Sequence, residues 1–100
     1  MVVDLNEYIK DLTFNDKKTL TQKVAKLFEE GGELAKQVLP FEGAYATNHR
    51  VVDKRRILEE VADVYLVNQS ILYSLNFTDS EFEEMVMRKA QIWNGLQVKE

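Results

Sequence analysis

Residues 28–38 read FEEGGELAKQV, in which two adjacent glycines stand among three glutamates. A glycine inside a helix costs about 1 kcal/mol relative to alanine. Apolar residues nevertheless recur at helical spacing on both sides of the pair, at Leu20, Val24, Leu27, Leu34 and Val38. Gly31 occupies the missing position of this stripe. We therefore predict one continuous helix, in which Gly31 lets another backbone or a ligand approach closely; a glycine C-cap ending a helix near residues 26–30 is the alternative.

Four helical segments follow one another along the chain, and no segment alternates with period two. The predicted helices are residues 2–12, a long helix from a cap at Asn15 or Asp16 to Leu39 before Pro40, a second long helix from a cap at Thr47 or Asn48 to Leu75, and a last helix from a cap at Thr78 or Asp79 to Leu96. Thr78 with Glu81 fits the capping-box pattern. The sequence thus predicts a single all-α domain over residues 1–100, a helical bundle with two long central helices and shorter flanking helices.

Composition limits the class of protein. The net charge is −4, and no basic arm is present, which argues against binding to duplex nucleic acid. The absence of cysteine excludes disulfides, thiolate metal sites and cysteine nucleophiles. The longest uncharged stretch, residues 64–78, is too short and too polar to span a membrane. The N-terminal residues do not resemble a signal peptide, so we expect a cytoplasmic protein without a membrane partner.

Two pairs of acidic residues share the same spacing. Glu30 and Glu33 lie three residues apart on one face of the first long helix, and Glu60 and Asp63 repeat this spacing on the second. Glu60 and Asp63 project into an apolar arc, and we expect residues 57–75 to be largely buried. Burying an unpaired carboxylate costs several kcal/mol. These acids therefore need either lysine or arginine partners or a bound cation; a solvated acidic face is the simplest alternative for Glu30 and Glu33.

The residue types indicate which cation would suit such a site. His49 is the single histidine, so the sets of cysteine and histidine typical of structural zinc sites are missing. The Glu-x-x-His pattern of di-iron bundles is also missing. Carboxylate oxygens favour Mg²⁺ or Mn²⁺, and Mg²⁺ usually shares its coordination shell with substrate phosphates. The residues thus predict a helical bundle that holds Mg²⁺ and acts on a phosphorylated molecule, without a P-loop or Rossmann motif.

Glu29-Glu30-x-x-Glu33 followed by Glu60-x-x-Asp63 resembles the EExxE…ExxD signature of the MazG-like all-α nucleotide pyrophosphohydrolases. The resemblance covers residues 20–94. It implies Mg²⁺-dependent hydrolysis of a (d)NTP to the (d)NMP and pyrophosphate. It also implies that Glu30, Glu33, Glu60 and Asp63 ligate Mg²⁺ and that Glu29 orients or deprotonates the attacking water. Mn²⁺ is an alternative metal.

The same resemblance implies a homodimer or homotetramer with sites near the subunit interface, in which two chains complete a four-helix core. In the last helix, Lys89 and Asn94 match positions that contact phosphate or sugar, although the usual trailing arginine is absent. Lys26, on the Glu30 face, and Arg56, on the Glu60 face, are further candidates for substrate binding. Trp93 either stacks on a base or packs in the core.

Two alternatives stay open. The chain could be a non-catalytic helical dimerisation or interaction module, whose carboxylates form ion pairs with lysine and arginine. It could also act on phosphoribosyl-ATP. The second alternative is disfavoured, because relatives of that type carry a histidine soon after the last aspartate of the signature, and residues 64–70 contain none.

Overall fold

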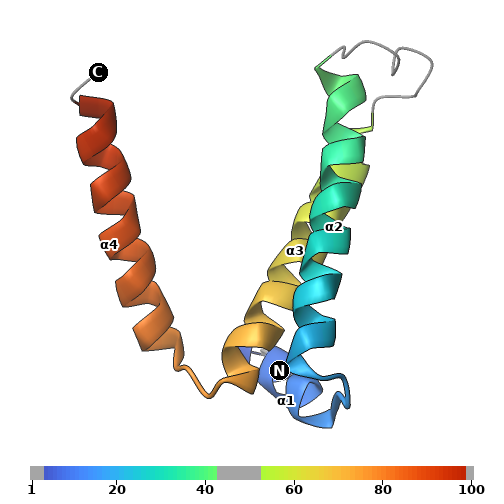
Figure 1. The fold of residues 1–100 in the computed structure, drawn as a ribbon, viewed down its shortest axis with the longest axis vertical. Coiled ribbons are helices and arrows are strands. Elements are labelled where there is room, and N and C mark those ends of the chain that lie inside the picture. Colours follow the sequence, from blue (N-terminus) through green and yellow to red (C-terminus); the bar gives the residue numbers. More distant parts are fainter. Residues whose placement is uncertain (1–3, 43–52, 99–100) are drawn as a thin grey trace.

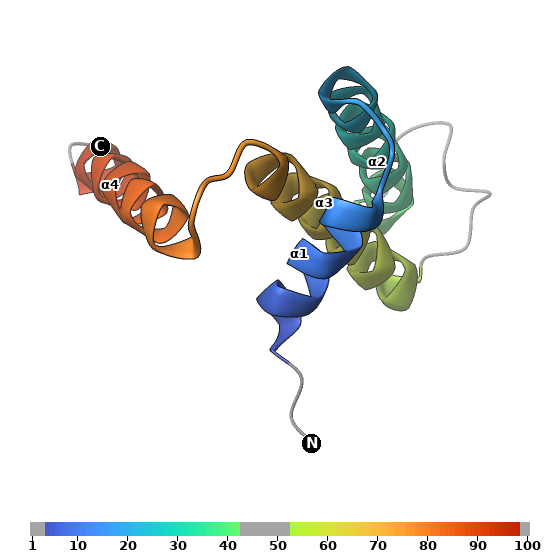
Figure 2. The ribbon, with the colours of Figure 1, turned by 90° about the horizontal axis from the view of Figure 1, so that it is seen from below.

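The computed structural model describes residues 4–42 and 53–98, which form four helices and no strand (Figure 1). The helices are α1 (Leu5–Asn15), α2 (Leu20–Phe41), α3 (Lys54–Ser74) and α4 (Asp79–Val98). The packed helix pairs are α2 with α3 and α1 with α3, and Figure 2 shows α1 lying beside α3. The predicted all-α fold is confirmed. Because α2 and α3 run antiparallel, the start of one lies beside the end of the other.

The start of α2 is set by a capping box at Thr19, three or four residues later than the predicted caps at Asp16 and Asn15. Thr19 Oγ1 accepts a hydrogen bond from Gln22 N, and Gln22 Oε1 accepts one from Thr19 N at 2.8 Å. Asp16 instead forms the C-cap of α1. The helix also continues through Pro40, so the predicted stop before this residue was wrong. Proline has a φ angle close to that of a helix, so it can sit in the last turn even though it removes one hydrogen bond.

The other boundaries agree in part with the prediction. Asp4 caps α1, and the described start of α3 is capped by Asp53, whose carboxylate accepts hydrogen bonds from two backbone N–H groups. The predicted caps at Thr47 and Asn48 lie outside the described residues, as does His49. The Thr78–Glu81 capping box is confirmed, with both reciprocal backbone hydrogen bonds present. The flanking helices α1 and α4 have 11 and 20 residues and the central helices α2 and α3 have 22 and 21, which agrees with the prediction of shorter flanking helices.

The glycine pair lies inside α2, which confirms the continuous helix and rules out the C-cap alternative. A Cβ atom added at Gly31 would meet nothing within 4 Å, and the same holds for Gly32. The expectation that Gly31 serves a close approach is therefore wrong within this chain, because the space beside it is open.

The described residues form a small core. Ile9 and Tyr73 are the only buried hydrophobic side chains among them. The radius of gyration is 16.8 Å, whereas a compact domain of this length has about 13 Å. The expectation that α3 is largely buried is wrong for the single chain, since Leu58 and Val61 are exposed. The described helices that pack on α3, α1 and α2, leave part of its apolar surface uncovered.

Helix α4 stands away from the α2–α3 pair and belongs to none of the packed helix pairs (Figure 1). Most of its large apolar side chains are exposed: Met85, Val86, Met87, Ile92, Trp93 and Leu96. Trp93 does not pack in a core within this chain. Among the described helices, none is long and apolar enough to cross a membrane.

Candidate metal-binding site

Helices α2 and α3 bring three carboxylates together. Glu30 comes from α2, and Glu60 and Asp63 come from neighbouring turns of α3. Each offers one oxygen, and these three oxygens lie within 4.8 Å of one another. We call this group the acidic cluster. It contains three of the four predicted metal ligands. Two antiparallel helices contribute them, and the ligand on α2 is about thirty residues from those on α3 in the sequence.

Glu60 is the member of the acidic cluster whose surroundings disfavour its negatively charged form. Its Oε2 atom is buried and has no hydrogen-bond partner among the residues that the structure describes. Burial raises the pKa of the Glu60 carboxyl, and the nearby carboxylates of Asp63, Glu30 and Glu33 raise it further. A buried oxygen without a partner is costly for the folded state. Protonation or a positively charged ligand would each relieve this cost.

One lysine partly neutralises the acidic cluster. Lys26 Nζ lies 3.0 Å from Glu30 Oε1 and 3.3 Å from Glu29 Oε1. Hydrogen bonds to Glu30 and then to Glu29 raise the pKa of Lys26. Within residues 4–42 and 53–98, neither Glu60 nor Asp63 has a lysine or arginine nitrogen within 4.0 Å of its carboxylate. Among the described residues, the ion pairing that the non-catalytic alternative predicts for the acids of this pattern therefore occurs at Glu30 and Glu29 only.

The remaining predicted residues on α2 and α3 surround the acidic cluster without joining it. Glu33 is exposed, but it lies close enough to Glu60 to raise the pKa of that carboxyl. The Glu29 side chain is also exposed and is held by Lys26. Arg56 is exposed, and its backbone N–H donates to the Asp53 cap.

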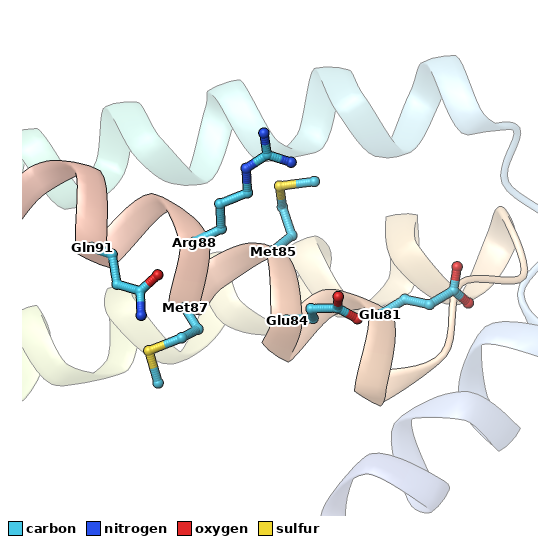
Figure 3. Close-up of a pocket in the computed structure, with 6 residues that line it drawn as sticks. All are labelled: Glu81, Glu84, Met85, Met87, Arg88 and Gln91. Atoms are coloured by element: carbon cyan, nitrogen blue, oxygen red, sulfur yellow. The ribbon is translucent and has the colours of Figure 1, made fainter.

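The predicted substrate contacts on α4 do not reach the acidic cluster within this chain. Lys89 and Asn94 are exposed on the helix that stands apart from α2 and α3 (Figure 1). A hollow of about 520 Å³ runs along α4, and Figure 3 shows that every side chain drawn along it, including Arg88, projects from this one helix. This hollow is the uncovered surface of α4 and shares no residue with the acidic cluster.

The donor set fits a hard divalent cation. Mg²⁺ binds oxygens at about 2.1 Å, so ligands on opposite sides of the ion lie about 4.2 Å apart. The oxygens of Glu30, Glu60 and Asp63 all lie within 4.8 Å of one another, an upper limit somewhat longer than this separation. Three carboxylate oxygens leave other coordination positions for water and for phosphate oxygens. The buried, unpartnered oxygen of Glu60 is the feature that a cation would satisfy.

The burial of Lys23, which lies seven residues before Glu30, was not predicted from the sequence. This lysine is only 5% exposed, and its Nζ donates to Ser74 Oγ at 2.6 Å. A separation of seven residues places two side chains on the same helical face, two turns apart. This spacing was the available signal, but it did not reveal that α3 would cover the lysine.

No known protein family, characterised protein or solved structure matches this chain.

Proposed function

We propose that this protein is a Mg²⁺-dependent nucleoside triphosphate pyrophosphohydrolase that converts a (d)NTP and water to the (d)NMP and pyrophosphate. The observation that carries the proposal is the acidic cluster. Glu30, Glu60 and Asp63 gather their oxygens within 4.8 Å, and one oxygen of Glu60 is buried without a partner. These residues belong to the EExxE…ExxD pattern, which supports a nucleotide rather than another phosphorylated substrate.

In this proposal the acidic cluster holds the cation, and Glu33 from the next turn of α2 is the fourth ligand. A bound Mg²⁺ or Mn²⁺ would neutralise triphosphate charge and help activate water. Glu29 orients or deprotonates the attacking water. Glu29 directly precedes Glu30 on α2, and its carboxylate is exposed and therefore accessible to solvent.

We further propose that the working form is a homodimer or homotetramer. The support is the amount of apolar surface that one chain leaves uncovered, including Leu58 on α3 at 68% exposure and Trp93 on α4 at 65%. Pairing the α2–α3 hairpins of two chains would create a four-helix core. A second copy would also offer Lys89 and Asn94 a route to an acidic cluster, because α4 stands away from the cluster of its own chain.

A panel of dNTPs and NTPs with Mg²⁺, and separately with Mn²⁺, tests the activity through release of pyrophosphate. We expect release from at least one nucleotide, and loss of turnover in Glu60→Gln and Asp63→Asn with helical content unchanged. Glu83→Gln is the matched control, since Glu83 is exposed on α4. Absence of release from every nucleotide with both metals would contradict the proposal. Unchanged turnover in the two cluster variants would refute the ligand assignment.

The second candidate function is a non-catalytic interaction module. The ion pairs of Lys26 with Glu29 and Glu30 favour it, because they show that lysine can partly satisfy these acids. Calorimetry with Mg²⁺ or Mn²⁺ and a non-hydrolysable nucleotide separates the two functions. The enzyme should bind metal and nucleotide with measurable heat, whereas the interaction module should give none at millimolar metal.

A further inference from the structure

A small hollow adjoins the acidic cluster on the seam between α2 and α3. Its volume is about 150 Å³, and it is lined by Asp16, Lys18, Lys23, Lys26, Leu66, Val67 and Ser70. A water molecule takes about 30 Å³ in the liquid, so the hollow can hold a small anion. Lys26 belongs both to this lining and to the ion pair with Glu30. The hollow therefore lies directly next to the acidic cluster, toward the start of α2.

Lys23 is the distinctive group in this lining, because it is buried beside the hollow and has no anionic partner in the described part of the chain. Its Nζ donates to the neutral Ser74 Oγ, which in turn donates to the Ser70 carbonyl oxygen at 2.7 Å. An ammonium has three donors, and within the described ranges the other two have no partner. No carboxylate there lies within 4.0 Å of it. The negative end of the α3 dipole, near Ser74, offsets only part of this charge.

The other charged groups of the lining leave the hollow positive. Lys26 is already engaged by Glu29 and Glu30. Asp16 accepts a hydrogen bond from the backbone N–H of Lys18. The Lys18 ammonium forms no ion pair with another described residue. Within the lining itself, Asp16 is thus the single carboxylate beside three lysines, of which Lys26 is already paired. A negatively charged ligand is the group that would complete this site.

We propose that the lysine-lined hollow binds phosphoryl groups, and specifically the pyrophosphate part of the triphosphate substrate. This assignment rests on the proposed function for the identity of the substrate, but the anion site itself does not. Along α2 the order is Lys23, Lys26 and then Glu30, with about 10 Å along the helix axis between the first and the last. The terminal phosphoryl groups lie toward the start of α2, and the scissile bond lies at the acidic cluster.

Calorimetry of the full chain with inorganic pyrophosphate, in EDTA and at low ionic strength, tests the anion site without metal. We expect binding by the unaltered protein. Lys23→Gln and Lys18→Gln should each weaken binding roughly tenfold through loss of a charge-assisted hydrogen bond. Lys36→Gln is the matched control, because Lys36 is exposed elsewhere on α2. Absence of pyrophosphate binding, or equal weakening by Lys36→Gln, would overturn the anion site.

Lys23 is buried, so its variant could fail to fold, and circular dichroism should accompany the titration. Lys18 is exposed, and Lys18→Gln keeps the test decisive if Lys23→Gln unfolds. Glu60→Gln separates the two proposals, because it disrupts the acidic cluster and should retain metal-free pyrophosphate binding. Pyrophosphate binding without any nucleotide hydrolysis would support the anion site and contradict the enzyme. Hydrolysis with an unchanged KM in both lysine variants would support the enzyme and contradict the anion site.

Discussion

Helices α2, α3 and α4 have similar lengths and similarly strong local signals for helix formation. Nevertheless, α2 and α3 pack against each other, and α4 does not pack against either. α2 and α4 both begin with a complete capping box, Thr19 with Gln22 and Thr78 with Glu81. α2 packs against α3 and contributes to a site, whereas α4 belongs to no packed pair. Capping and helical spacing decide whether a helix forms. They do not decide what the helix packs against, because that depends on a complementary face elsewhere.

Two isoleucines probe this difference most strongly. Ile9 on α1 is 3% exposed, and Ile92 on α4 is 53% exposed. Ile9→Ala should lower the free energy of unfolding by about 2–4 kcal/mol, because it removes buried methyl groups and leaves a cavity. Ile92→Ala should cost about 0.5 kcal/mol or less in a monomer. Urea denaturation followed by circular dichroism measures both changes.

The same pair of variants tests whether a second copy covers α4. If it does, the cost of Ile92→Ala will grow with protein concentration in the micromolar range, since dissociation is coupled to unfolding. The loss of stability caused by Ile9→Ala should not depend on protein concentration in this way. Equal and concentration-independent losses from the two variants would show that the contrast between α4 and the packed helices is wrong.

Tyr73 provides a link of intermediate strength between the packed helices and α4. Its hydroxyl donates to Asp79 Oδ1 at 2.5 Å and accepts from Gln69 Nε2 at 3.2 Å. Asp79 is the first residue of α4 and also lies 3.6 Å from Lys10 Nζ. Tyr73→Phe should lower the free energy of unfolding by about 1 kcal/mol at neutral pH, because it leaves Asp79 and Gln69 without this partner. Tyr8→Phe, at an exposed position on α1, is the control.

The pH dependence of stability provides a second measurement on Tyr73. Burial, followed by the hydrogen bond to Asp79, raises the pKa of Tyr73 to about 12 in the folded protein. An unfolded chain titrates near its ordinary value of about 10. The folded state therefore favours the protonated phenol, and this stabilisation is complete below pH 10 and is lost as the pH rises toward 12. Tyr73→Phe should flatten the fall in stability between about pH 10 and 12, and an unchanged slope would contradict the assignment.

The sequence predicted the helices better than their packing. Thr78 and Glu81 marked the start of α4 because a capping box is a local interaction. The acidic cluster was predictable in part, because Glu30, Glu60 and Asp63 each hold a fixed place on their own helix. The burial of Lys23 could not be predicted in the same way. It depends on the antiparallel register of α2 and α3, which brings Ser74 to the lysine from fifty-one residues away.

Substitutions at the glycine pair in α2 should have the smallest effect on stability. They also distinguish a covered helix surface from an uncovered one. Neither Gly31 nor Gly32 has an atom within 4 Å of an added Cβ. Gly31→Ala and Gly32→Ala should therefore each stabilise an isolated chain by up to about 1 kcal/mol, through better helix propensity. Urea denaturation at low protein concentration measures this gain. A loss of stability in both variants would contradict the open space beside the helix.

The two glycines differ in position, and this difference gives the experiment its second outcome. Gly31 is half-buried on the stripe that continues from Leu27 to Leu34, whereas Gly32 is exposed on another face. If a second chain or the phosphates of a substrate lie against the stripe, Gly31→Ala will weaken self-association or raise the KM for the nucleotide. Gly32→Ala will then keep its gain without either defect. Identical behaviour of the two variants in all three measurements would mean that nothing approaches Gly31, and that only its helix-propensity cost distinguishes it from alanine.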